Sequence, residues 1–148
     1  MTKATAQVSR KIDAPVDTVW RAITTPESVG KFFFGAKVES DFRVGSPIRF
    51  KGNFKGKAYE DKGEILAVDK QHHLSFSHYS PSSGAPDKPE NYHVVAYDLA
   101  EDGTGTMVVL TQSNLQGDVK PSDIEHKAEY EKNWNVVLDG LSKVAARE

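Results

Sequence analysis

The C-terminal part of the chain holds the strongest constraint on the fold, a long helix with two unlike faces. Ser122 and Glu125 form an S-x-x-E pattern, which predicts a capping box at the start of this helix. At 100° per residue, the apolar side chains that follow fall within an arc of about 120°. They are Tyr130, Trp134, Val137, Leu138, Leu141, Val144 and Ala145. A helix of about 24 residues is about 36 Å long, so the rest of the chain must supply an apolar surface that covers it.

Residues 36–114 have the pattern of short strands joined by turns. Apolar and polar residues alternate there with the period of two that half-buried strands show. Three of these strands carry a polar side chain on an apolar face, in the sets Leu74, Phe76 and His78; His93, Val95 and Tyr97; and Val108, Leu110 and Gln112. Because turns rather than helices join the strands, the pattern predicts an antiparallel meander.

Two features interrupt this meander. Gly63 lies inside the strand expected over residues 57–69, and it predicts a bulge that bends the sheet. Residues 80–91 are rich in proline and serine and predict a long connection between two strands. This connection offers little to bury, so it is expected to be more mobile than the strands on either side.

The segment before residue 36 supplies one further strand and two short helices. Residues 4–12 alternate as a half-buried strand does, with Arg10 on the apolar side. Arg10 is expected to lay its stem on the sheet and keep its guanidinium in water, because an unpaired buried charge is costly. Pro15 and Pro26 stand where first helical residues are expected, since proline lacks an N–H that would have no partner there. Residues 1–148 are therefore predicted to form a single α+β domain.

Composition excludes several classes of protein. The chain has no cysteine, which rules out disulfides and thiolate metal sites. Its 19 basic and 21 acidic residues lack the basic excess of a nucleic-acid binder. The N-terminus has no apolar run long enough for a signal peptide, and no stretch approaches the roughly 20 apolar residues that cross a bilayer. The expectation is a cytoplasmic protein that binds no nucleic acid and has no membrane span.

Short motifs occur in the helix-grip order of strand, two short helices, further strands and long helix. They are Ile12-Asp-Ala-Pro15 followed by Val19-Trp20, Gly63-Glu-Ile-Leu66, Leu74-Ser-Phe76, Gly105-Thr-Met-Val-Val-Leu-Thr111 and Tyr130-x-x-x-Trp134-x-x-x-Leu138-x-x-Leu141. In this order they resemble the SRPBCC (START/Bet v 1-like) superfamily. The C-terminal pattern narrows the resemblance to the branch related to the activator of Hsp90 ATPase. Where members often carry a tryptophan pair after the second helix, this chain has Phe33-Phe34-Gly35.

The resemblance implies a curved antiparallel sheet of about seven strands wrapped on the long helix, with a cavity between them. Members of the superfamily include lipid carriers, hormone receptors, cyclases and co-chaperone domains. A small hydrophobic molecule is therefore the expected partner, and no cofactor is expected. The side chains expected to line the cavity are Phe33, Phe34, Phe50, Tyr59, Phe76, His78, His93, Tyr97, Val108, Leu110, Gln112, Tyr130, Trp134 and Leu141. A fully packed core without a cavity is the alternative arrangement of the same residues.

Two other functions stay open. An enzyme of the cyclase, dehydratase or hydrolase type could use the same cavity, with His78, His93 or Tyr97 as acid or base. No nucleophile motif or phosphate loop occurs, so no catalytic residue is predicted. No metal site is predicted either, because two histidines on separate strands fall short of three convergent ligands. The third function is protein interaction, as in the Hsp90 co-chaperone, although this chain corresponds only to the C-terminal domain of that protein.

Overall fold

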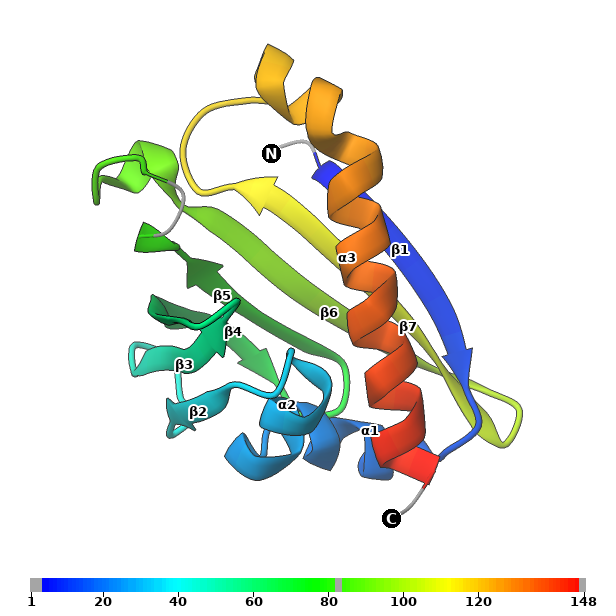
Figure 1. Cartoon of the computed structure of the whole chain (residues 1–148). Helices are drawn as coiled ribbons and strands as arrows, with labels where there is room; N and C mark the ends of the chain where they lie inside the picture. Colours follow the sequence, from blue (N-terminus) through cyan, green and yellow to red (C-terminus); the bar gives the residue numbers. More distant parts are fainter. Residues whose placement is uncertain (1–3, 82–83, 147–148) are drawn as a thin grey trace.

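A long helix lies across the concave face of a curved antiparallel sheet (Figure 1). The computed structural model describes residues 4–81 and 84–146. The sheet has seven strands in the order β1-β7-β6-β5-β4-β3-β2. In chain order, the elements are β1 (Ala4–Ile12), α1 (Val16–Ile23), α2 (Pro26–Phe32), β2 (Lys37–Ser40), β3 (Pro47–Phe54), β4 (Lys57–Asp69), β5 (His73–His78), a 3-10 helix (Pro89–Asn91), β6 (His93–Asp102), β7 (Gly105–Asn114) and α3 (Pro121–Ala146). The predicted α+β helix-grip fold is confirmed.

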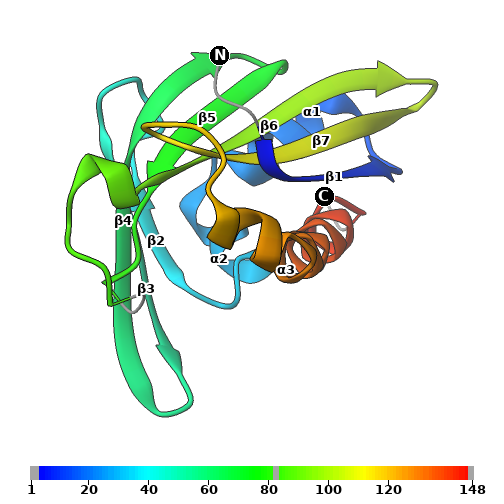
Figure 2. The same ribbon diagram turned by 90° about the horizontal axis from the view of Figure 1, so that it is seen from above.

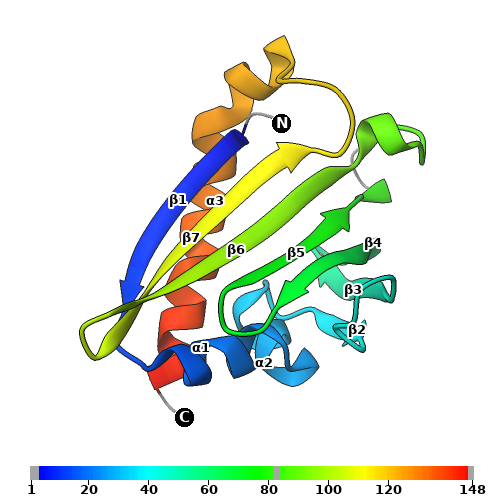
Figure 3. The same cartoon turned by 180° about the vertical axis from the view of Figure 1, so that it is seen from behind.

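The strand register brings the expected polar and apolar side chains to one inner face of the sheet. His78 is paired with His93 across β5 and β6, and Val95 is paired with Gln112 across β6 and β7. Because paired residues point to the same side of a sheet, the three predicted sets share this face. Figure 2 shows the sheet curling around α3, and Figure 3 shows the strands from the opposite side.

The helix α3 is held mainly by the C-terminal half of its apolar face. Val137, Leu138 and Leu141 are fully buried, and α3 packs against β1, α1 and α2. The two short helices lie at the end of the sheet where α3 finishes (Figure 1). In the part of the chain that the structure describes, no helix combines the length and the apolarity that crossing a membrane requires.

Polar contacts between β1 and α3 correct the expectation for Arg10. Its guanidinium forms an ion pair with Asp139 of α3, so it does not merely extend into water. Further along β1, the backbone N–H of Gln7 donates to Glu131 Oε2 at 3.0 Å. Both contacts lie at the edge of the helix, and Asp139 is more than half exposed. Exposed pairs of this kind add little to stability, so we expect both contacts mainly to fix the position of α3 over β1.

The start of α3 differs from the predicted capping box at Ser122 and Glu125. The helix begins at Pro121, and Asp123 takes the capping role, because its Oδ2 accepts the backbone N–H of Lys120 at 2.8 Å. The same oxygen accepts Asn114 Nδ2 at 2.9 Å, which joins the helix start to the end of β7. Asp123 is buried, so these hydrogen bonds replace the water that its carboxylate loses on folding.

The bend in β4 also differs from the prediction. The register against β5 shifts between Ile65 and Ala67, so the irregularity is at Leu66 and not at Gly63. Gly63 serves another purpose, since a Cβ there would stand 1.6 Å from the backbone oxygen of Ser77. Only glycine allows β4 and β5 to approach so closely at this point.

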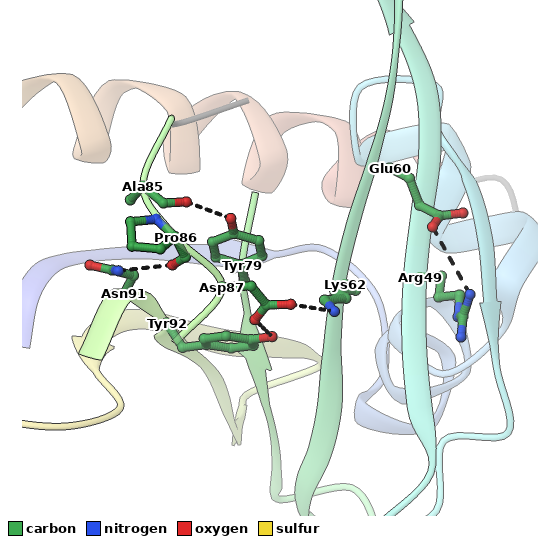
Figure 4. A network of polar contacts seen from close by, with 9 residues as sticks. All are labelled: Arg49, Glu60, Lys62, Tyr79, Ala85, Pro86, Asp87, Asn91 and Tyr92. Carbon is green, nitrogen blue, oxygen red and sulfur yellow. Dashed lines mark hydrogen bonds and ion pairs between the residues drawn. The ribbon is translucent and has the colours of Figure 1, made fainter. Parts of the chain in front are cut away.

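The connection from β5 to β6 is tied to the sheet by a network of polar contacts (Figure 4). Tyr79 Oη donates to the oxygen of Ala85 at 2.6 Å, and Tyr92 Oη donates to Asp87 Oδ1 at 2.6 Å. Asp87 also pairs with Lys62 of β4 at 2.6 Å. Within the predicted connection 80–91, residues 82–83 lie outside the described residues. Its greater mobility stays a prediction.

The contact between α2 and α3 gives a stability prediction at Gly140. A Cβ there would lie 2.7 Å from Phe32 Cβ and 3.0 Å from Phe32 Cα. Alanine is favoured over glycine in a helix by about 1 kcal/mol, but this overlap should reverse the sign. We expect Gly140→Ala to lower the free energy of unfolding by about 1–3 kcal/mol, measured by urea denaturation. The exposed control Asn135→Ala should be neutral or slightly stabilising, and a stabilised Gly140→Ala would contradict the packing described.

Candidate functional site

A pocket of about 570 Å³ opens between the N-terminal half of α3 and the inner face of the sheet. Strands β3, β4, β5 and β7 form its floor, and the connection from α2 to β2 closes one side. The lining residues are Phe33, Phe34, Phe50, Tyr59, Asp61, His78, Ser80, Gln112, Glu129, Tyr130, Asn133 and Trp134. The pocket therefore lies between the long helix and the sheet, where the helix-grip arrangement predicts a cavity.

Aromatic rings in mutual contact form one wall of the pocket. Phe33 stacks on Phe50 with ring centroids 4.6 Å apart, and its centroid is 5.9 Å from that of Trp134. Phe34 meets Phe33 edge to face at 5.8 Å. These rings come from three parts of the chain that are distant in sequence. Their contacts hold the wall in one arrangement without filling the space in front of it.

A tight turn after α2 presents Phe33 and Phe34 to the pocket. The N–H of Ala36 donates to the oxygen of Phe33 at 3.1 Å, and the two central residues, Phe34 and Gly35, have φ of 56° and 70°. Glycine adopts this backbone readily, whereas phenylalanine does so at a cost of about 1–3 kcal/mol. The Phe34 side chain is 58% exposed, so burial of its ring offsets little of that strain.

A chain of hydrogen bonds fixes the inner end of the pocket. Trp134 Nε1 donates to Gln112 Oε1 at 2.8 Å, and Gln112 Nε2 donates to Thr5 Oγ1 at 3.0 Å. Thr5 Oγ1 donates in turn to the backbone oxygen of Gln112 at 3.2 Å. The irregular register of β1 between Ala4 and Ala6 turns Thr5 toward the inside, where it is buried. Gln112 thus positions the Trp134 ring, and both polar atoms of its side-chain amide have hydrogen-bond partners within the protein.

A carboxylate and an imidazole meet on the floor of the pocket. Asp61 Oδ2 and His78 Nε2 are 3.2 Å apart, and both side chains are largely buried. Within the described residues, Asp61 Oδ1 is buried without a hydrogen-bond partner. Burial raises the pKa of the neighbouring Tyr59 hydroxyl, and the negative charge of Asp61 raises it further. Asp61 and His78 thus bring two largely buried polar side chains to a pocket whose lining also includes six aromatic residues.

His93 stands behind this pair, opposite His78 in the sheet. Burial lowers the pKa of His93, and the nearby His78 lowers it further. Its ring lies 6.1 Å from the ring of Tyr130, whose own pKa is raised by burial. His93 therefore favours its neutral form and supports the pocket from outside the lining.

Some of the residues predicted to line the cavity do so in the structure, and the others lie outside the pocket lining. Eight of them line the pocket, namely Phe33, Phe34, Phe50, Tyr59, His78, Gln112, Tyr130 and Trp134. The other six lie outside the lining, with Phe76, Tyr97, Val108, Leu110 and Leu141 buried in the core and His93 half-buried beside Tyr130. Burial also raises the pKa of the Tyr97 hydroxyl. The centre of the molecule is thus a packed core, and the pocket lies toward one end.

Four lining residues were not predicted: Asp61, Ser80, Glu129 and Asn133. Glu129 is exposed and borders the pocket from the edge of α3. Asp61 lies opposite Phe50 in the register of β3 and β4, a pairing that the structure reveals. In the described part of the chain, no group of three or more histidine, cysteine, aspartate or glutamate side chains could hold a metal ion.

The fold and the pocket define a helix-grip protein with a cavity under its C-terminal helix. Residues 13–146 match the family described as Activator of Hsp90 ATPase homolog 1-like protein, and the chain belongs to this family. This is the branch that the sequence motifs resembled, so that prediction is confirmed. No curated protein matches the chain.

Solved structures with the same fold come from several bacteria. The solution structure of ChR145 from Cytophaga hutchinsonii is 44% identical, with a TM-score of 0.76, and the match covers 96% of this chain and 93% of that one. The crystal structure of NE0264 from Nitrosomonas europaea is 19% identical, with a TM-score of 0.76 over 95% of this chain and 93% of that one. The latter likeness concerns the fold alone.

The lowered pKa of His93 predicts a pH-dependent loss of stability. Since the unfolded chain binds a proton on this histidine more readily than the folded chain, stability falls as the pH drops from about 6.5 through the folded pKa. His93→Gln should reduce this loss by up to about 1.4 kcal/mol per pH unit in that window, measured by urea unfolding near pH 7.5 and 5.5. The exposed control His72→Gln should keep the wild-type dependence. A variant at His93 that loses stability as steeply as the wild type would contradict this account.

Proposed function

We propose that this protein binds a small hydrophobic molecule in the pocket under α3. The observation that carries the proposal is a cavity of about 570 Å³ with six aromatic side chains in its lining, Phe33, Phe34, Phe50, Tyr59, Tyr130 and Trp134. Small-molecule sites of about 300–1,000 Å³ are mostly apolar and contain a few polar groups that orient the ligand.

The hydrogen bonds of the pocket support a preformed site. Trp134 and Gln112 satisfy each other, so this part of the wall requires no ligand to keep its shape. Asp61 and His78 are the polar groups that remain available to orient a bound molecule. A wall that is already ordered costs little entropy on binding, which favours affinity.

A second candidate, acid–base catalysis in the same pocket, rests on the pairing of His78 Nε2 with Asp61 Oδ2 at 3.2 Å. A histidine held by a carboxylate beside an apolar cavity can transfer protons to and from a bound molecule. Native mass spectrometry of the purified protein would identify a copurified compound. If incubation converts that compound to a product, His78→Gln should abolish conversion while the compound still binds; equal conversion by the variant would exclude this role.

The pocket can be filled from α3 without touching the core. Asn133 and Asn135 flank Trp134, both are exposed, and only Asn133 lines the pocket. We expect Asn133→Trp to fold like the wild type and to weaken binding of 1-naphthalenemethanol by about tenfold or more, because the new ring occupies the cavity. Ligand-observed NMR titration measures the affinity.

Asn135→Trp is the matched control, since it adds the same ring to the same helix outside the pocket. Its affinity for 1-naphthalenemethanol should equal that of the wild type. Equal weakening by both variants would contradict the proposed function.

A further inference from the structure

The charged groups in the pocket lining all have one sign. Asp61 comes from β4 and Glu129 from α3, and the described residues that line the cavity include no lysine or arginine. An anionic ligand would therefore meet two carboxylates, and the one imidazole in the lining, that of His78, is already paired with Asp61. Because a charge that leaves water without a partner is costly, this pocket is unsuited to carboxylates, sulfates and phosphates of small apolar molecules.

The neighbours of Asp61 in sequence do not offset its charge within the pocket. Alternation along β4 directs Glu60 and Lys62 to the outer face. There Lys62 pairs with Asp87 at 2.6 Å, and Glu60 pairs with Lys51 at 3.6 Å. The carboxylate of Asp61 thus faces the cavity with His78 as its neighbour.

One oxygen of Asp61 lacks a donor. Oδ2 is 3.2 Å from His78 Nε2, whereas Oδ1 is buried and has no hydrogen-bond partner among the described residues. A buried acceptor without a donor is unfavourable, and the Asp61 side chain is still 15% exposed. A ligand N–H that reaches this exposed part would add a donor to a carboxylate whose one side-chain partner in the described part of the chain is His78. A hydrogen bond between an ammonium group and a carboxylate is about twice as strong as one between neutral groups.

The aromatic wall adds a second attraction for positive charge. Phe33 and Phe50 stack on each other and are buried, whereas the half-buried Trp134 beside them lines the cavity with a ring whose face carries negative electrostatic potential. Tyr59 and Tyr130 add further rings to the lining. Aromatic faces combined with carboxylates are the surroundings in which proteins recognise organic cations.

We propose that the ligand is an amine with an apolar body, whose protonated nitrogen donates to the carboxylate of Asp61 while the body lies against the aromatic wall. This inference rests on the proposed function, because it concerns the same pocket. It adds the sign of the ligand charge and the residue that recognises it.

Three probes with the same naphthalene ring test the proposal: 1-naphthylmethylamine, 1-naphthalenemethanol and 1-naphthoic acid, which near neutral pH are cationic, neutral and anionic. In NMR titrations of the wild-type protein, we expect the amine to bind about tenfold more tightly than the acid. If the alcohol binds but the acid equals or exceeds the amine, the inference fails and the proposed function stands. If none of the three binds, both fail.

Two variants assign the preference to its residue. Asp61→Asn removes the charge with little change of shape, and it should bring the amine and the acid to about equal affinity. The matched control Glu60→Gln removes a neighbouring charge from the outer face and should keep the wild-type ratio. A wild-type ratio in Asp61→Asn would overturn the role of Asp61. If circular dichroism shows that Asp61→Asn does not fold, Glu129→Gln at the exposed edge of α3 is the second test. This variant should reduce the ratio of amine affinity to acid affinity, and an unchanged ratio would overturn the proposal.

Discussion

Burial of the apolar face of α3 against the concave sheet is the interaction on which the other features depend. Val137, Leu138 and Leu141 are fully buried, and each such side chain contributes about 1.5–3 kcal/mol when it leaves water. This packing sets the distance between helix and sheet at the C-terminal half of α3. The contact of Gly140 with Phe32 then brings α2 against the same half.

The pocket exists because a different set of contacts holds the N-terminal half of α3. Asp123 joins the start of the helix to Asn114, and Trp134 Nε1 donates a hydrogen bond to Gln112 near the same end of β7. Hydrogen bonds at these points position the helix without requiring that apolar side chains fill the space below it. Asp61 and His78 can therefore stand inside the protein beside an open volume, where a bound molecule would replace the water that they lose.

Periodicity predicted the strands, the long helix and the inner face of the sheet, and the resemblance to the superfamily supplied their helix-grip arrangement. His78, His93 and Gln112 occupy the side of the sheet that their alternation indicated, because residue spacing determines direction along a strand. Residue spacing does not determine whether an inward side chain lines a pocket or packs in the core. Phe50, which lines the pocket, and Tyr97, which lies in the core, therefore show the same alternation pattern in the sequence. Their difference depends on the distance to α3, which is a property of the folded chain.

Pairing between strands and helices accounts for the remaining differences. Asp61 was overlooked because its position opposite Phe50 follows from the register of β3 and β4, which the sequence alone does not specify. Arg10 pairs with Asp139, which belongs to a helix far along the chain, so residue spacing near Arg10 does not indicate this contact. At the start of α3, two capping patterns overlap, and the one at Asp123 prevails because it also reaches Asn114.

The division of α3 into a packed half and a pocket half has a consequence for how proteins of this shape diversify. Residues that hold the fold together and residues that line the pocket are separated along one helix, with Leu138, Leu141 and Val144 in the C-terminal half and Tyr130 and Asn133 before them. Changes in the second group can accumulate with little loss of stability, because their side chains support few core contacts. Selection can thus act on binding preference while the scaffold persists, and the shared fold of this chain and NE0264 at 19% identity is compatible with such a history.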